Sequence, residues 1–153
     1  MLWLLSMVFA YPSGTFIRQE SAAQTKEAHA KALEETLSAS NFLVRNAARK
    51  RLADRPYSCT QYRIKSYEDR LEINCDQRPT FVIRLDGTVT TYKGKKIEVH
   101  AADGRIEQYI GTKKGGIKII YTFQKDGFSV QKIIQSRHLG KDLAIQNTYK
   151  IQP

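Results

Sequence analysis

The spacing of hydrophobic residues changes at Pro56 from a helical period to a strict alternation. Before it, from about residue 20 to 54, apolar residues recur once per helical turn, as at Leu33 and Leu37. After it, apolar and polar residues alternate in short runs rich in Val, Ile, Thr, Tyr and Phe. The pattern predicts an N-terminal helical segment followed by an antiparallel β region.

The helical segment is expected to be a helix or a helix pair. Ser38-Ala39-Ser40-Asn41 interrupts the apolar pattern, and Ser40 is a candidate N-cap for a second helix. The segment should end before Pro56, because proline disfavours helix at the residue that precedes it. Residues 12–18, with Pro12 and Gly14, have the composition of a linker.

Turn residues divide the β region at short intervals, which predicts an antiparallel β-meander of about nine strands. The turn pairs are Asp86-Gly87, Lys93-Gly94, Asp103-Gly104, Gly115-Gly116, Asp126-Gly127 and Leu139-Gly140. The expected strands cover residues 58–66, 69–76, 80–85, 88–93, 96–101, 105–112, 117–125, 128–138 and 142–151. The fold class is therefore α+β, mainly β: a closed or half-open barrel with the helical segment against its mouth or flank.

Two-residue loops fix the expected strand registers. A loop at Asp103-Gly104 sets Val99 opposite Gln108 and His100 opposite Glu107, which separates an apolar face from a wet one. A loop at Asp126-Gly127 sets Tyr121 opposite Lys132. A loop at Asp86-Gly87 gathers one face from two strands, with Phe81, Ile83, Leu85, Thr90 and Tyr92.

Cys59 and Cys75 flank the first expected hairpin and lack the spacing of redox or zinc motifs. They are either buried thiols or a disulfide, and export of the protein would favour the disulfide. A two-residue turn at Tyr67-Glu68 leaves them one position out of line. A bulge or a three-residue turn is therefore expected to align them.

The apolar segment 1–11 has the length of an export-signal core and is too short to span a bilayer as a helix. It lacks a basic leading region, so a buried strand or helix start over residues 2–9 is the alternative. The expected organisation is a signal-like segment and linker over 1–18, then one domain made of a helical segment, 19–55, and the meander, 56–153. The expected location is periplasmic or secreted.

The chain has 153 residues, 41% of them hydrophobic, which suits one domain with one core, and a net charge of +10. Such a charge attracts anionic surfaces or simply keeps the protein soluble. A basic run on the second expected helix is either an anionic-surface contact or a solvated face: Arg45, Arg49, Lys50 and Arg51. Nucleic acid is a disfavoured partner, because no aromatic residues are interleaved with these cations.

The enclosed face of the sheet carries one cation among its apolar residues, Lys132. A lysine in a filled core is costly, so a cavity that holds an anionic ligand would explain it. The alternatives are a bulge that turns Lys132 outward, or a side chain whose stem extends to the rim and keeps the charge in water. The predicted ligand-binding set is Lys132, Tyr92, Gln108, Tyr121, Asn147 and Tyr149.

Catalytic motifs are missing from the sequence, and the three histidines, His29, His100 and His138, have no second metal ligand at a useful spacing. The sequence therefore favours a non-enzymatic exported protein, without cofactor or metal, that binds a lipid or another acidic or amphipathic small ligand. The alternative is an interaction or inhibitor protein without a cavity, which contacts a protein or an anionic membrane through its basic surface. The ligand, the oligomeric state and the family are left open.

Overall fold

The computed structural model describes residues 9–52, 58–112 and 115–153. A first strand, β1 (Gly14–Arg18), precedes two helices, α1 (Ala22–Ser38) and α2 (Phe42–Leu52). The remaining strands are β2 (Gln61–Ser66), β3 (Arg70–Cys75), β4 (Phe81–Arg84), β5 (Thr90–Tyr92), β6 (Lys95–Ala102), β7 (Arg105–Thr112), β8 (Gly115–Phe123), β9 (Gly127–Ser136) and β10 (Leu143–Ile151). Most of the apolar segment expected to be an export signal lies outside the described residues.

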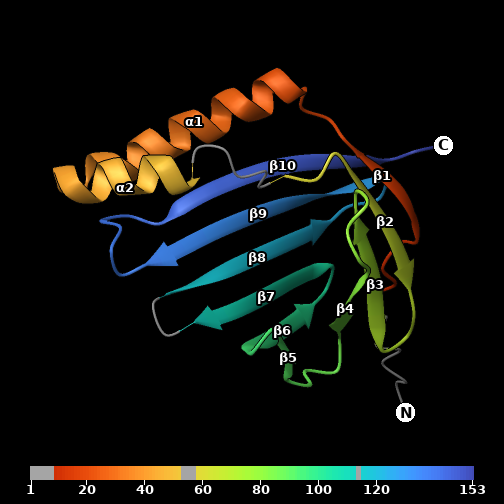
Figure 1. Cartoon of the computed structure of the whole chain (residues 1–153). Helices are drawn as coiled ribbons and strands as arrows, with labels where there is room; N and C mark the ends of the chain where they lie inside the picture. The colour runs from red at the N-terminus through yellow and green to blue at the C-terminus, as the bar shows by residue number, and fades with distance from the viewer. Residues whose placement is uncertain (1–8, 53–57, 113–114) are drawn as a thin grey trace, which may run out of the picture.

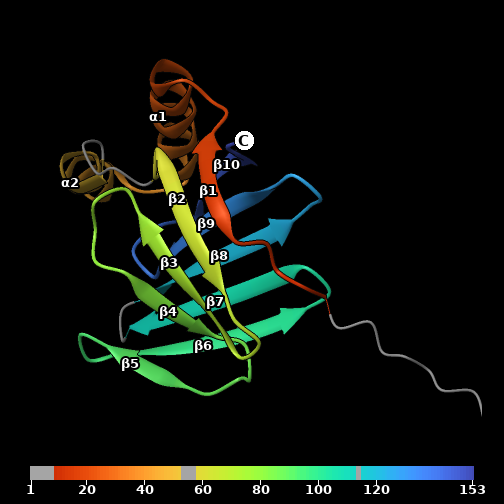
Figure 2. The ribbon, with the colours of Figure 1, turned by 90° about the vertical axis from the view of Figure 1, so that its right-hand side faces the viewer.

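The predicted fold class is confirmed: two helices precede an antiparallel meander that curls into a half-barrel (Figures 1 and 2). The sheet has ten strands rather than about nine, because the segment expected to be a linker contains β1. This strand lies between β2 and β10, and its buried Phe16 faces Tyr62 on one side and Ile151 on the other. Pro12, which precedes it, and Gly14, which begins it, hid a short strand with a single buried side chain.

The sheet ends in two unpaired edges, β4 and β5, which are consecutive in the sequence but at opposite ends of the strand order. The hairpin predicted at Asp86-Gly87 is therefore wrong. In such a hairpin, Leu85 and Thr88 would exchange backbone hydrogen bonds. Instead, the Leu85 N–H donates to the Asp69 carbonyl at 2.9 Å, and the Thr88 N–H donates to Asp86 Oδ1 at 3.0 Å. The loop consequently crosses from one edge to the other and leaves the barrel open.

The helices cover one end of the inward face of β10. Along this strand the alternate residues Leu143, Ile145, Asn147 and Tyr149 are all buried. The first two pack under α1 with Leu33 and Leu37, whereas Tyr149 belongs to the core of the curled sheet. The main core is aromatic in this region, with Phe16, Tyr62 and Phe128 around Tyr149.

Polar caps set the ends of the helices. Ser21 and Gln24 form a reciprocal capping box at the start of α1. The predicted cap of α2, Ser40, is wrong by one residue, since Asn41 Oδ1 accepts the Val44 N–H at 3.0 Å. The Ser40 hydroxyl instead accepts the N–H of Gly140 at 3.2 Å, which ties the α1–α2 turn to the β9–β10 loop.

The register predicted at Asp103-Gly104 is confirmed, with Val99 opposite Gln108 and His100 opposite Glu107. Both turn residues have positive φ angles, 46° and 82°, as a type I′ turn requires. The register predicted at Asp126-Gly127 is wrong by two residues, because Ile119 rather than Tyr121 pairs with Lys132.

Close approach of neighbouring strands explains two glycines that resemble turn residues. A side chain at Gly127 would place its Cβ 2.1 Å from the Tyr149 carbonyl oxygen. A Cβ atom at Gly115 would lie at the same distance from the Gln135 carbonyl oxygen. Each glycine is therefore the first residue of a strand, and the predicted turn at Gly115-Gly116 is wrong. A two-residue shift leaves every side chain on its expected face, since the side-chain period of a strand is two.

Cys59 and Cys75 form a disulfide with Cα atoms 5.6 Å apart. The cysteine hairpin turns at Glu68-Asp69, one residue later than predicted, and the Tyr67 N–H donates to the Arg70 carbonyl at 2.9 Å. This shift moves the register by two residues and pairs Tyr62 with Cys75. The expected three-residue turn is therefore wrong. Cys75 pairs with Tyr62, three residues beyond Cys59, and Cys59 reaches it from the segment that precedes β2.

Removal of the disulfide should destabilise the fold without changing its topology. The bond closes a loop over a sequence separation of 16 residues, so the Cys59→Ala/Cys75→Ala variant should lose about 3 kcal/mol of unfolding free energy. Urea unfolding followed by circular dichroism measures this loss. A thiol reductant should lower the wild-type midpoint and leave the double variant unchanged; an insensitive wild type would contradict the prediction.

Candidate functional site

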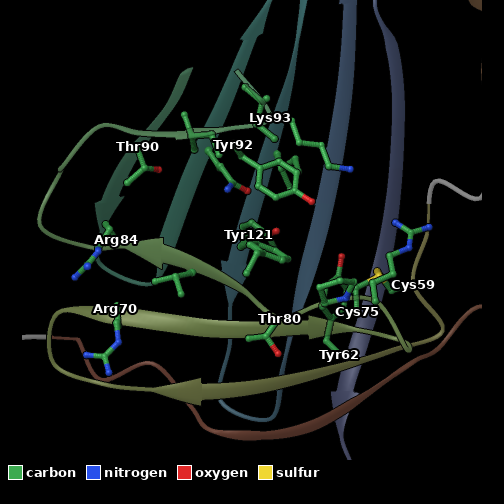
Figure 3. A pocket seen from close by; sticks show the side chains of 18 of the residues that line it. Cys59, Tyr62, Arg70, Cys75, Thr80, Arg84, Thr90, Tyr92, Lys93 and Tyr121 are labelled. Atoms are coloured by element: carbon green, nitrogen blue, oxygen red, sulfur yellow. A yellow bond between two sulfur atoms is a disulfide. The ribbon is translucent and has the colours of Figure 1, made fainter. Parts of the chain in front are cut away.

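A cavity of about 880 Å³ lies inside the curled sheet, between its two unpaired edges (Figure 3). Its volume is in the range of small-molecule binding sites. One side is formed by β3, β4 and the loop that joins them, and the opposite side is formed by β5 and β6. The inward faces of β7, β8 and β9 complete the wall, so the gap between β4 and β5 produces the cavity.

The wall of the cavity is mainly apolar. Aliphatic side chains from three successive strands line it, namely Ile97 of β6, Ile110 of β7 and Ile119 of β8. The Cys59–Cys75 disulfide lies in the wall, close to Tyr62 and Thr80 (Figure 3). Such a surface can hold a hydrocarbon tail or a ring.

Every charged residue that lines the cavity within the described part of the chain is basic. These cations are Arg70, Arg78, Arg84, Lys93 and Lys132. They come from different strands and loops, so the curvature of the sheet brings together charges that are scattered along the sequence. The cavity therefore combines apolar walls with an excess of positive charge.

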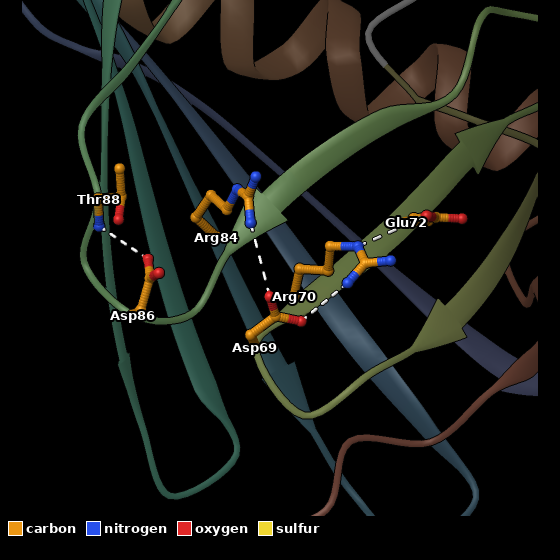
Figure 4. A network of polar contacts seen from close by, with 6 residues as sticks. All are labelled: Asp69, Arg70, Glu72, Arg84, Asp86 and Thr88. Carbon is orange, nitrogen blue, oxygen red and sulfur yellow. Dashed lines mark hydrogen bonds and ion pairs between the residues drawn. The ribbon is translucent and has the colours of Figure 1, made fainter.

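Two of the five cations are held by carboxylates outside the cavity (Figure 4). Asp69 lies 2.9 Å from Arg70 and 3.6 Å from Arg84, and Glu72 lies 3.6 Å from Arg70. The hydrogen bond from Arg70 to Asp69 raises the pKa of Arg70. These pairs fix the two arginines beside the mouth.

Lys132 lies on the inward face of β9, between Ile119 of β8 and Ile145 of β10. The strand pairing is continuous through this position, and the side chain is half-buried. Burial first, and then the nearby Arg78 guanidinium, lower the pKa of Lys132 from 10.5 to about 8. The fold therefore places a cation where its charged form is disfavoured.

The predicted ligand-binding residues separate into two groups. Lys132, Tyr92, Gln108 and Tyr121 all line the cavity. Gln108 is buried, and its Oε1 has no hydrogen-bond partner among the described residues. A buried acceptor of this kind is costly unless a donor reaches it. Tyr92 is exposed at the rim, with the Lys93 ammonium 5.3 Å from its ring centroid.

Asn147 and Tyr149 lie behind the cavity, in a small recess next to Lys132. The Tyr149 hydroxyl donates to the Cys59 carbonyl oxygen at 2.6 Å, and the Ser58 hydroxyl donates to Asn147 Oδ1. Burial raises the pKa of Tyr149 well above its usual value. Both side chains attach β10 to the segment that carries Cys59.

The basic residues predicted to contact an anionic surface lie on α2, away from the cavity lining. Arg49, Lys50 and Arg51 are exposed, whereas Arg45 is half-buried. Arg49 donates to both carboxylate oxygens of Glu34 on α1, at 3.0 and 2.9 Å. This bond lowers the pKa of Glu34 and connects the two helices.

One group of metal-type side chains among the described residues has its ligand atoms close together: Cys59, Cys75 and Asp76. Both sulfur atoms are engaged in the disulfide, so neither is a thiolate ligand. The Asp76 carboxylate accepts the N–H groups of Thr60 and Gln61, each at 3.0 Å to Oδ1. It therefore closes the end of the cysteine hairpin.

The cations contributed by β3, β4 and their loop were not predicted from the sequence. Arg70, Arg78 and Arg84 reach the cavity because β4 stays apart from β5, and a closed Asp86-Gly87 hairpin would have removed that edge. The alternation along β6, β7 and β8 did place Ile97, Ile110 and Ile119 on one inward face. The sequence pattern therefore indicated which side of each strand faces inward, but not which strands form the edges of the sheet.

The chain matches no model of a known protein family, and no curated protein matches its sequence. Neither described helix is long and apolar enough to cross a membrane.

Burial of Lys132 should make the stability of the fold depend on pH. Its pKa is about 8 in the folded protein against 10.5 in the unfolded chain. The unfolded chain therefore holds more protons between these values, and stability at this site rises with pH through that interval. Lys132→Met should be more stable than wild type at neutral pH, by up to about 3 kcal/mol, and this advantage should shrink toward pH 10.

Unfolding titrations in urea at several pH values measure this difference. The exposed Lys125 supplies the matched control, because Lys125→Met removes a cation without relieving burial. Ionisation of the core tyrosines is common to all three proteins and cancels in the comparison. An advantage of Lys132→Met that stays constant or grows with pH would contradict the assignment.

Proposed function

We propose that the protein binds an acidic, amphipathic small molecule in the half-barrel cavity, without catalysing a reaction on it. The observation that carries the proposal is the composition of the cavity: apolar walls and five basic side chains, with no carboxylate among the described lining residues. An acid group beside Lys132 would compensate the cost of burying its charge. A hydrocarbon tail or ring would then contact Ile97, Ile110 and Ile119.

The uncharged or titratable side chains at this site that could take part in acid–base or nucleophilic chemistry are lysine, tyrosine and threonine. The described lining includes no histidine, serine, aspartate or glutamate, and its two cysteines are joined. What the lining offers is charge, apolar contact and a buried amide, Gln108. These groups select and hold a ligand rather than transform it.

We further propose that the protein works in an oxidising compartment, the periplasm or the extracellular space. A disulfide is compatible with such a location, because disulfides persist there and are rare in the reducing cytosol. The bond also lies in the cavity wall, so the environment that maintains it maintains the shape of the site.

Lys132→Gln should weaken the binding of an acidic probe and spare its neutral counterpart. The suitable pair is 11-(dansylamino)undecanoic acid and its methyl ester, followed by dansyl fluorescence at neutral pH. Loss of a charge-assisted contact should reduce affinity for the acid about tenfold or more, with little change for the ester. Lys125→Gln, which removes an exposed cation outside the cavity, should leave both affinities unchanged. Equal binding of acid and ester by wild type would refute the charge-based part of the proposal.

Filling the cavity should abolish uptake of both probes. Ile110 is half-buried and lines the wall, so Ile110→Trp would extend an indole into space that is otherwise free for ligand. The expected result is loss of dansyl enhancement for acid and ester alike, with an unfolding midpoint close to that of wild type. Val89→Trp, at an exposed position outside the lining, is the matched control and should bind normally. Unimpaired binding by a folded Ile110→Trp variant would place the ligand elsewhere.

A further inference from the structure

The outer face of α2 presents bulky apolar side chains to solvent. Leu43 is 79% exposed and Phe42 is 67% exposed, which makes them the most exposed large hydrophobic residues in the described chain. They begin the helix, directly after its Asn41 cap. Exposed apolar groups next to each other indicate a contact surface more often than isolated ones do.

The burial of the other residues of α2 shows that Phe42 and Leu43 lie on its outer side. Ala48 is buried and packs in the small core with Leu33 and Leu37 of α1. Residues on the opposite side of the helix, Asn46, Ala47 and Lys50, are exposed. Phe42 and Leu43 therefore point away from the core that anchors the helix.

Cations flank the apolar pair. Arg49, Lys50 and Arg51 form the last turn of α2 and are exposed, and the helix contains no acidic residue. Arg49 is paired with Glu34 of α1, so Lys50 and Arg51 carry the remaining exposed charge of this last turn. Figure 1 shows α2 beside α1, on the side of the molecule away from β4 and β5. The face is thus separate from the cavity mouth.

We propose that α2 docks the protein on an anionic lipid bilayer. Phe42 and Leu43 enter the boundary between headgroups and acyl chains, while Lys50 and Arg51 contact lipid phosphates. Helices that combine an apolar face with flanking lysine and arginine lie in the membrane interface in this way. The positive charge of the patch and of the whole chain, +10, complements an anionic leaflet.

A bilayer suits this face better than an acidic protein does. Each exposed cation contributes modestly to adsorption on an anionic surface, and the insertion of two large side chains adds a hydrophobic contribution to it. A fluid surface accepts such side chains without a shaped pocket, and α2 offers a convex helix rather than a groove. The docking surface is independent of the cavity ligand, so either proposal can fail alone.

Co-sedimentation with sucrose-loaded vesicles tests the proposal on the full chain. Wild type should bind vesicles of phosphatidylcholine with 30% phosphatidylglycerol, and bind pure phosphatidylcholine far more weakly. Lys50→Glu/Arg51→Glu should lower the partition coefficient about 30-fold or more. Phe42→Ala/Leu43→Ala should lower it about tenfold at unchanged charge.

Matched controls distinguish docking by α2 from general attraction of a basic protein. Arg63 and Lys65 are exposed on β2, so Arg63→Glu/Lys65→Glu makes the same charge change at another site. Val89→Ala removes an apolar side chain exposed elsewhere. Both controls should bind nearly as wild type does. The proposal is overturned if wild type ignores anionic vesicles, if the α2 variants bind normally, or if the β2 charge reversal is equally damaging.

Discussion

The failure of β4 and β5 to pair is the constraint on which the rest of the structure depends. The strands are joined by a short loop and belong to one sheet, yet they form its opposite edges. The N–H groups that a hairpin would pair at this turn have other acceptors: Leu85 donates to the Asp69 carbonyl and Thr88 donates to the Asp86 carboxylate. The curled sheet between these separated edges contains a cavity of about 880 Å³.

The cavity also contains a charged side chain, Lys132, in apolar surroundings. Lys132 shares the inward face of β9 with apolar residues, and its pKa of about 8 reports the cost of this position. Continuous strand pairing fixes the backbone position of Lys132, because the neighbouring strands pair without interruption on both sides of it. Behind it, Tyr149 binds the Cys59 backbone and the disulfide links that segment to β3. These contacts hold the backbone of β9 and β10 in place around Lys132.

The sequence predicted faces more reliably than edges, for a geometric reason. Side chains alternate with a period of two, so a register error of two residues leaves Lys132, Ile119 and Gln108 facing the same interior. Errors arose where one residue type serves two purposes. Gly127 and Gly115 resemble turn residues but begin strands, where a neighbouring carbonyl leaves no room for a Cβ atom. Composition also concealed β1, because a strand with one fully buried side chain gives little periodic signal. The arginines near the mouth depend on which strands are edges, and this is decided by long-range pairing rather than by local pattern.

An open edge gives access to the interior, but it is also a hazard for aggregation. Unpaired strands offer their backbone groups to other chains, and proteins limit this by keeping edge strands short and charged. Here β4 has four residues and β5 has three. Arg84 ends β4 and Lys93 follows β5, so each edge carries a cation that repels a second copy of the same edge. The same cations line the cavity. Under the proposed function these cations would also attract an acidic ligand to the mouth of the cavity. One set of charges would then both protect the edges and recruit the ligand. An opening that excludes other protein strands would admit a small anion.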